Sequence, residues 1–373
     1  MLNILLKDSL LPVVVSFILS MICGFITIPQ ILKFCVHYNI YDLPNARKVH
    51  HNNIPRLGGV AFLPSVIIAV LITLTTFDSF YQNKTLSINL WTCLFFLGLI
   101  VIYITGLIDD IVGLKANVKF LIQFIVVCFL PLCHLYINNL YGFLGIYNMA
   151  YWIGAIFTAF FLVYTINALN LIDGIDGLCS SLSLIALCGF GILFYRIKFY
   201  AYATIITGMM GVLIAYTYYN LFGDSNKHKK IFMGDSGSTT LGFLLGVLTV
   251  KYSMITPLFP VDLPNHLIMA MSLISVPLLD VARIIIVRLY HHEGIFNPDK
   301  NHIHHKLLRA GLSQHQALSV IIVLALCIIG TNILLMPMLN TTWIVGIDIL
   351  LYWLFNVAVN YFINKRGAKV YMI

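Results

Sequence analysis

The feature that most constrains this chain is a series of eleven apolar runs, each long enough to cross a lipid bilayer as an α-helix. Only 10% of its 373 residues are charged, whereas soluble domains carry about a quarter. Since backbone polar groups must be hydrogen-bonded internally in lipid, we predict an all-α, polytopic integral membrane protein with about eleven transmembrane helices. The runs are 10–32, 58–77, 91–108, 118–137, 150–166, 179–195, 201–220, 237–256, 266–288, 317–338 and 344–363.

Lys and Arg are divided unevenly between the two sets of loops that eleven spans would create. One set, which includes the C-terminal tail, carries 16 of the 22 basic residues, and the other set carries five. Because basic loops stay in the cytoplasm, we expect the N-terminus outside and the C-terminus in the cytoplasm. No internal repeat or low-complexity tract divides the chain, so residues 1–373 are expected to form a single transmembrane domain.

Five polar motifs interrupt the apolar pattern, and all of them fall on predicted cytoplasmic ends. Ordinary solvated loops would explain any one of them. Because all five adjoin apolar runs on the same side of the membrane, we expect them to assemble a single site there. The motifs are RKVHHNNIPRLGG (47–59), IDD (108–110), NALNLIDGIDGL (167–178), FMGDSGS (232–238) and NPDKNHIHHKLL (297–308).

Two adjacent acids, Asp109 and Asp110, directly follow an apolar run. A carboxylate at the centre of a membrane helix costs about 2.5–3.5 kcal/mol, and less near the interface. Neighbouring carboxylates also repel each other unless a cation lies close by. Solvation at a helix end is the alternative, but we favour metal binding or substrate positioning.

The motif NALNLIDGIDGL contains two amides and two carboxylates at three-residue steps, a spacing that keeps side chains on roughly one helix face. Its glycines predict that the helix loosens and lets the backbone approach a ligand. Mg²⁺ takes one or two protein oxygens of these types together with substrate phosphates. Capping of a helix end is the alternative. The polar residues are Asn167, Asn170, Asp173 and Asp176, and the glycines are Gly174 and Gly177.

The motif FMGDSGS is typical of a phosphate-binding turn, because small residues expose backbone N–H groups. A helix that starts at Ser238 would direct its positive end at such a site. Asp235, within the turn, would hold a metal ion against the phosphates. The motif lacks the GxxxxGK[ST] pattern of a Walker A loop, so by itself it is a weak signal.

The last motif combines imidazoles with cations: His302, His304, His305, Lys306 and Arg309. Zinc binding is one reading, but neither a cysteine nor an HExxH pattern accompanies the histidines. Binding of phosphate or sugar hydroxyl groups suits these donors better. Asp280 and Arg283, three residues apart in the ninth run, are predicted to pair with each other in a structural role.

In this order, the motifs resemble those of the polyprenyl-phosphate N-acetylhexosamine-1-phosphate transferase family, glycosyltransferase family 4, in its bacterial undecaprenyl-phosphate branch. The resemblance covers positions 47–308 and rests on RKVHHNNIPRLGG, GLIDDIVGLKANVKFLIQ, NALNLIDGIDGL, IFMGDSGSTTLG and FNPDKNHIHHKLL. It implies an inner (cytoplasmic) membrane enzyme whose active site faces the cytoplasm. Such an enzyme transfers a HexNAc-1-phosphate, by default GlcNAc-1-phosphate, from a UDP-sugar to undecaprenyl phosphate. UMP is released, in the first membrane step of cell-envelope polysaccharide synthesis.

The resemblance also implies a role for each matching residue. Asp109, Asp110 and Asp173 would be catalytic. Asn170 and Asp235 would bind Mg²⁺, with Mn²⁺ as the alternative ion. The nucleotide would contact Lys48, Gly174, Asp176 and Phe232, and the diphosphate and sugar would contact His302, His304 and His305. We expect no nucleic-acid partner, and a homodimer stays open.

Several alternatives are left open at this point. The HIHH form argues against the phospho-MurNAc-pentapeptide transferase of peptidoglycan synthesis, and a cation-coupled transporter is the reading from another class. The segment after Asn220, LFGDSNKHKK, is longer than the family's usual linker and puts Asn220 in doubt as a uracil contact. Asp109 or Asp110 would act either as a general base or by positioning phosphate and metal. We favour positioning, because a phosphate monoester, with a second pKa near 6, is mostly dianionic at pH 7.

Overall fold

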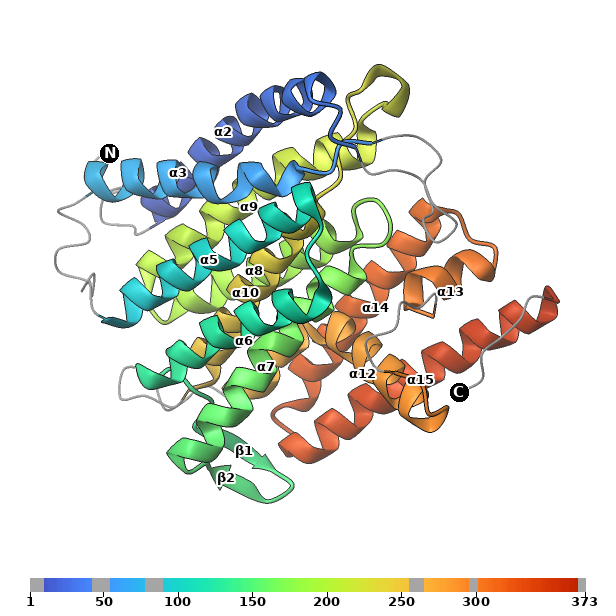
Figure 1. The fold of residues 1–373 in the computed structure, drawn as a ribbon. Helices are drawn as coiled ribbons and strands as arrows, with labels where there is room; N and C mark the ends of the chain where they lie inside the picture. Colours follow the sequence, from blue (N-terminus) through green and yellow to red (C-terminus); the bar gives the residue numbers. More distant parts are fainter. Residues whose placement is uncertain (1–9, 42–53, 78–89, 255–264, 295–300, 368–373) are drawn as a thin grey trace.

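The computed structural model of the protein describes residues 10–41, 54–77, 90–254, 265–294 and 301–367, and long helices make up most of it (Figure 1). The elements in chain order are α2 Leu10–His37, η1 Gly58–Ala61, α3 Phe62–Thr76, α5 Leu90–Val112, α6 Ala116–Leu132, β1 Asn139–Phe143, β2 Ile146–Asn148, α7 Tyr151–Ile172, α8 Leu178–Arg196, α9 Tyr200–Phe222, η2 Ser225–Lys227, α10 Gly234–Ser253, α11 His266–Leu273, α12 Ser275–Tyr290, α13 Ile303–Arg309, α14 Gln314–Leu335 and α15 Thr341–Lys365.

Each of the eleven predicted runs contains a helix, which confirms a helical, polytopic membrane protein. Eight helices of the described part are long and apolar enough to cross a membrane. The ninth run is divided into α11 and α12, which meet at an angle of 79° and would make one further, broken span. Of the other two, α6 has only 17 residues and α10 opens with the polar sequence GDSGSTT. The count of eleven crossings and the orientation of the termini therefore stay predictions.

A short antiparallel hairpin, β1–β2, is the one part of the described fold that departs from the all-α expectation. It joins α6 to α7, in a segment that the apolar runs leave outside the predicted spans. Its carbonyl groups at Tyr141 and Gly142 accept hydrogen bonds from Thr341 and Thr342 at the start of α15. The hairpin thereby ties α15 to the rest of the bundle at the end where α15 begins.

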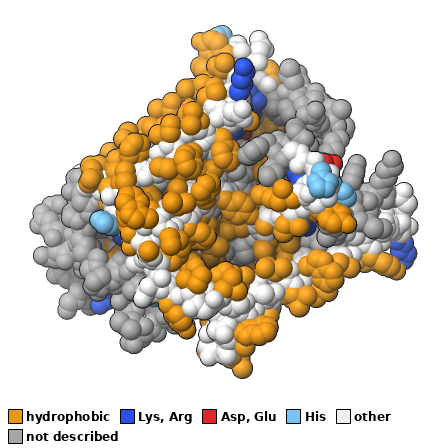
Figure 2. Space-filling view, turned by 60° about the horizontal axis from the view of Figure 1, so that its bottom comes forward, with side chains coloured by type: hydrophobic (Ala, Val, Ile, Leu, Met, Phe, Trp, Pro, Cys, Tyr) orange, Lys and Arg blue, Asp and Glu red, His pale blue; other side chains and the backbone are white. Residues whose placement is uncertain are grey.

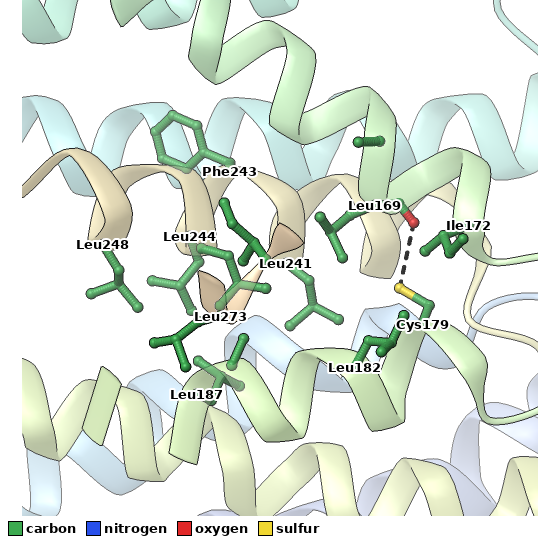
Figure 3. Packing of buried hydrophobic residues seen from close by; sticks show 14 of the residues in the cluster. Leu169, Ile172, Cys179, Leu182, Leu187, Leu241, Phe243, Leu244, Leu248 and Leu273 are labelled. Atoms are coloured by element: carbon green, nitrogen blue, oxygen red, sulfur yellow. Dashed lines mark hydrogen bonds between the residues drawn. The ribbon is translucent and has the colours of Figure 1, made fainter. Parts of the chain in front are cut away.

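Helix α10 runs through the centre of the bundle. It packs against α5, α7, α8 and α11, and all but a few of its side chains are buried. Figure 3 shows Leu241, Leu244 and Leu248 of α10 lying against apolar residues of neighbouring helices. This helix is enclosed by protein, and the hydroxyl groups of Ser238, Thr239 and Thr240 donate to carbonyl groups one turn earlier.

The outer surface of the bundle is strongly apolar. Large hydrophobic side chains such as Leu97, Phe160 and Leu334 are exposed, and orange side chains cover much of the described face in Figure 2. A soluble monomer rarely exposes apolar patches larger than a few hundred Å². This surface is the one expected of a protein whose helices contact lipid tails.

Candidate active site

The described parts of the predicted polar motifs meet near the end of α5, the start of α6, the end of α7 and the start of α10. These helices pack on one another, α10 against α5 and α7, and α6 against the same two. Helices α5 and α10 approach each other closely at Gly106 of α5. A Cβ atom added there would lie 2.6 Å from the Cα of Ser236 and 2.7 Å from the carbonyl oxygen of Asp235. Only glycine lets α5 lie this close to the first turn of α10.

Asp110 holds the start of α10. Its carboxylate is 3% exposed and accepts hydrogen bonds from the backbone N–H groups of Asp235 and Ser236, at 2.8 and 2.9 Å. Arg56 donates to the backbone carbonyl of Asp110 at 2.7 Å. An acid at a helix N-terminus satisfies amides that lack a partner within the helix. Asp110 therefore fixes the backbone that carries Asp235.

The first turn of α10 differs from the predicted phosphate-binding turn. The helix starts at Gly234 rather than at Ser238, because Asp110 supplies the acceptors that allow helical geometry four residues earlier. The amides of Asp235 and Ser236 are consequently bonded to protein. A phosphate at this helix end would have to meet other donors.

Asp109 and Asp235 face a shared cation. The ammonium group of Lys119, in the second turn of α6, donates to the carboxylate of Asp109 at 3.0 Å and also to that of Asp235. The backbone N–H of Leu114 donates to the other oxygen of Asp109 at 2.6 Å. All three charged side chains are partly buried. The two adjacent acids of the IDD motif thus point to different partners, and Lys119 offsets the repulsion between carboxylates.

The predicted metal ligands, Asn170 and Asp235, are in direct contact. The side-chain amide of Asn170 donates to the carboxylate of Asp235 and to the hydroxyl of Ser238, both at 2.9 Å. Asn170 lies on the last turn of α7, which continues to Ile172, past the predicted boundary at 166. Amide and carboxylate are thus held side by side by two helices.

After Ile172 the chain leaves the helix, as the glycines of NALNLIDGIDGL predict. Gly177 adopts a left-handed conformation with φ +73° and precedes α8. Its N–H donates to the side chain of Asn220 at 2.6 Å, and Asn220 in turn donates to the carbonyl of Ile231 at 2.8 Å. The oxygen and the nitrogen of the Asn220 side chain therefore both bond to backbone groups, in line with the doubt about a uracil contact.

Asp176 forms an ion pair with Lys230, at 2.6 Å from its ammonium nitrogen. Lys230 belongs to LFGDSNKHKK, the stretch that is longer than the family's usual linker. The longer linker of this chain thus brings the ammonium group of Lys230 to Asp176, the residue expected to face the nucleotide base.

The histidine segment reaches the same turn. His304, on α13, is 1% exposed, and a Cβ atom added to Gly174 would lie 2.0 Å from its Nε2 atom. The rings of His302 and His304 are parallel, with centroids 5.9 Å apart, and His305 follows at 4.3 Å from His304. A side chain at position 174 would therefore displace the imidazole of His304. The prediction that Asp280 and Arg283 pair is confirmed, at 2.9 Å.

Two titratable groups at this end of the bundle are shifted by their surroundings. Burial, reinforced by the nearby carboxylates of Asp235, Asp176 and Asp110, raises the pKa of Asp173 to about 7. Burial lowers the pKa of His304 well below its ordinary value, and the neighbouring imidazoles act in the same direction. At neutral pH His304 is therefore uncharged, and Asp173 is close to its midpoint.

Two predicted nucleotide contacts remain to be placed. Phe232 is half-buried, and its backbone bonds to Pro55 at 2.7 Å and to Gly58 at 2.9 Å. Residues 55–59 therefore lie along the extended stretch before α10. Lys48 falls outside the described residues.

Sequence reasoning did not single out Lys119 or Lys230 as site residues. Lys119 was visible only as one of several cytoplasmic basic residues. A sharper signal was present, because Lys119 stands in the second turn of an apolar helix that starts just after the IDD motif. The reversal between α5 and α6 returns it to Asp109.

The residues present fit a Mg²⁺ ion. Within the part of the chain that the structure describes, no three acidic, histidine or cysteine side chains form a metal cage. Mg²⁺ does not need one, because it keeps several waters and takes one or two protein carboxylates plus substrate phosphates. The Lys119 ammonium between Asp109 and Asp235 shows that a cation is accommodated there. Asn170 lies beside Asp235 with its amide nitrogen toward that carboxylate, and its side chain would have to turn to offer its oxygen to the ion.

Comparison with known proteins identifies relatives of this chain. Residues 91–253 match the family model of glycosyl transferase family 4. The chain is 32% identical over 321 residues to a probable undecaprenyl-phosphate N-acetylglucosaminyl 1-phosphate transferase of Bacillus subtilis, covering 85% of this chain and 83% of that protein. It is 31% identical over 302 residues to an undecaprenyl-phosphate alpha-N-acetylglucosaminyl 1-phosphate transferase of Yersinia pestis, covering 80% and 77%. The Escherichia coli K12 protein of the same name is 29% identical, with the same coverage.

The matched region contains the IDD, NALNLIDGIDGL and FMGDSGS motifs, whose residues form the contacts among α5, α6, α7 and α10. The relatives match four-fifths or more of the chain, so the likeness extends well beyond these motifs. This chain belongs to glycosyl transferase family 4.

Proposed function

We propose that this protein transfers N-acetylglucosamine-1-phosphate from UDP-GlcNAc to undecaprenyl phosphate, releasing UMP, with Mg²⁺ as cofactor. The observation that carries the proposal is the cluster of Asp109, Lys119, Asn170 and Asp235 at the meeting point of four helix ends. Two carboxylates that share a cation, with an amide bonded to one of them, suit a diphosphate with its metal ion. The names of the relatives supply the sugar and the lipid.

The reaction would join a phosphate oxygen of the lipid to the β-phosphorus of the nucleotide sugar and break the bond from that phosphorus to the oxygen of UMP. Bound Mg²⁺ would neutralise the diphosphate and stabilise the leaving group. Asp235 and Asn170 would hold the ion, and Lys119 would attract the phosphates. The imidazoles of His302, His304 and His305 would bind the sugar side of the diphosphate, since the ammonium group of Lys306 is bonded to Asn356.

The environment of the IDD motif favours positioning over base catalysis. Asp110 already accepts two backbone hydrogen bonds, which an acid that removes a proton would have to surrender. Asp109 is paired with Lys119. The lipid phosphate, with a second pKa near 6, has little need of a base at pH 7.

A turnover assay with defined substrates tests the proposal. The purified full-length protein, in mixed micelles with undecaprenyl phosphate and UDP-GlcNAc, should release UMP only when Mg²⁺ or Mn²⁺ is present. A panel of UDP-GalNAc and UDP-MurNAc-pentapeptide identifies the donor and separates the peptidoglycan alternative. Absence of UMP release with every donor refutes the transferase proposal for this chain.

We place the site on the cytoplasmic side of the inner membrane, on the strength of the basic loops. A soluble nucleotide sugar would reach it there, while the lipid phosphate stays in the bilayer. A C-terminal green fluorescent protein fusion should fluoresce and a C-terminal alkaline phosphatase fusion should be inactive, because the first reporter folds in the cytoplasm and the second outside it. The reverse result contradicts the proposed orientation.

A further inference from the structure

A buried carboxylate lies behind the histidine segment, on the second half of the broken helix pair. Asp280 of α12 has no solvent exposure. It accepts four hydrogen bonds: from His302 Nδ1 at 2.8 Å, from the backbone N–H of Ile303 at 3.1 Å, from Arg283 at 2.9 Å and from the hydroxyl of Tyr352 at 2.9 Å. The pairing of Asp280 with Arg283 is therefore only one part of a larger network.

Four donors around one carboxylate require its ionised form, because a protonated acid loses acceptor capacity. A buried charge is tolerated only while its partners stay in place. The donors come from three elements: α12 itself, the start of α13 and the middle of α15. Asp280 therefore ties the histidine segment to both helices at a single point.

Lys306, a cationic side chain of the histidine segment, is also anchored to α15. Lys306 is 3% exposed, and its ammonium group donates to the side chain of Asn356 at 2.8 Å, one turn beyond Tyr352 on α15. Seven-residue α13 thus has a fixed contact at its start and another at its middle. A short helix of this kind has little stability of its own, so these contacts decide its position.

The network leads directly to the candidate active site. His302, held by Asp280, lies parallel to His304, and His304 fills the space beside Gly174. Gly174 belongs to the turn that carries Asp173 and Asp176. A displacement of His302 would therefore shift the His304 ring and, through it, the turn that carries Asp173 and Asp176.

We propose that Asp280 is a positioning residue for the transfer reaction, an inference that rests on the proposed function. By accepting a hydrogen bond from His302 Nδ1, it fixes one ring orientation and directs Nε2, the acceptor nitrogen of that tautomer, away from the carboxylate, where it would accept a hydrogen bond from a sugar hydroxyl group. A carboxylate partner of this kind selects the tautomer and orientation of a functional imidazole. The hydroxyl group of Tyr352, on α15, donates a further hydrogen bond to the same carboxylate.

The test is a double-mutant cycle between Asp280→Asn and His302→Ala in the full-length protein. Asparagine has nearly the same shape but presents an amide N–H₂ to groups that are themselves donors. We expect kcat to fall about 10–100-fold, the range found for partners of metal-bound histidines, with a smaller change in KM for UDP-GlcNAc. In the His302→Ala background the same change should have no further effect, because the residue it positions is gone.

Two further variants keep the test decisive. Asp224→Asn changes an exposed acid that pairs loosely with Lys227 at 3.9 Å, and it should leave kcat unchanged. Tyr352→Phe removes one donor and keeps the charge of Asp280. If Asp280→Asn does not fold, Tyr352→Phe takes its place in the cycle, with a smaller loss of kcat that again vanishes in the His302→Ala background.

The outcomes separate this inference from the proposed function. Failure of the wild-type protein to release UMP from any donor refutes the function itself. With an active wild type, an equal loss in both backgrounds shows that Asp280 acts only on the fold, and overturns the positioning role. Full activity of His302→Ala overturns it as well.

Discussion

Substitution of Gly106 by alanine should reduce the activity strongly and the stability of the fold only slightly. The added Cβ would lie 2.6 Å from the Cα of Ser236, about 0.8 Å short of an ordinary contact at 3.4 Å. The neighbouring atoms are backbone, so α5 and α10 must separate. Overpacking of this kind costs about 1–3 kcal/mol, and the helix propensity of alanine offsets about 1 kcal/mol of it. We therefore expect a loss of only about 0–2 kcal/mol in the free energy of unfolding.

The same displacement acts on the reacting groups. Asp110 and Asp235 are joined across this contact by the hydrogen bond at 2.8 Å, and Asp235 carries the contacts with Lys119 and Asn170. A misplacement of about 1 Å can reduce a rate by about 100-fold. We expect kcat of the G106A variant to fall about 10–100-fold while its melting temperature changes by a few degrees.

UMP release and thermal unfolding in the same detergent measure the two effects. Gly346 of α15 is the matched control, because an added Cβ there meets nothing within 4 Å, and G346A should keep full activity. A G106A protein that folds with the kcat of the wild type would refute the reasoning. So would a loss of activity that only follows the fraction of unfolded protein.

Three further predictions concern charged groups. Replacing Lys119 by methionine should lower kcat more than 100-fold, a loss on the scale of a removed electrostatic stabiliser, whereas the same change at the exposed Lys115 should have little effect on UMP release. Asp173, with its pKa raised to about 7, holds its proton in the folded state at pH values where the unfolded chain has lost it. Stability without metal should therefore fall as pH rises from about 4 to 7, and D173N should flatten this trend in thermal unfolding; an unchanged slope contradicts it. Burial lowers the pKa of Lys306 to about 7, so the unfolded state binds more protons between about pH 7 and 10, and stability should rise with pH across that window. The K306M variant should not show this rise in stability with pH. A melting temperature of K306M that still rises between about pH 7 and 10 would contradict the assignment of the rise to Lys306.

Part of the site was predictable because polar residues are rare in an apolar chain. Asp109, Asn170 and Asp235 stand out against the runs that flank them, and the order of their motifs resembles one family. Their partners did not stand out. Lys119 and Lys230 lie among other basic loop residues, and only the folded chain shows that they contact Asp109, Asp235 and Asp176.

Helix boundaries were the weakest part of the sequence reading. The predicted end of the fifth span at residue 166 preceded the end of α7 by six residues. An apolar run shows which residues can face lipid, whereas the helix continues for as long as its backbone hydrogen bonds do. The predicted start of α10 at Ser238 was late for a different reason. Asp110, more than a hundred residues away, satisfies the first amides of that helix.

The amino-acid sequence by itself determined the class of this protein. Long apolar runs require helices wherever lipid excludes water, and polar motifs at their ends identify the family. The tertiary structure decided which oxygens meet which cations. Those pairings depend on how closely helices approach, as at Gly106, on the turn at Gly174 that admits the His304 ring, and on buried acids such as Asp110 and Asp280 that organise distant segments. Such contacts join residues far apart in the chain, and no local pattern encodes them.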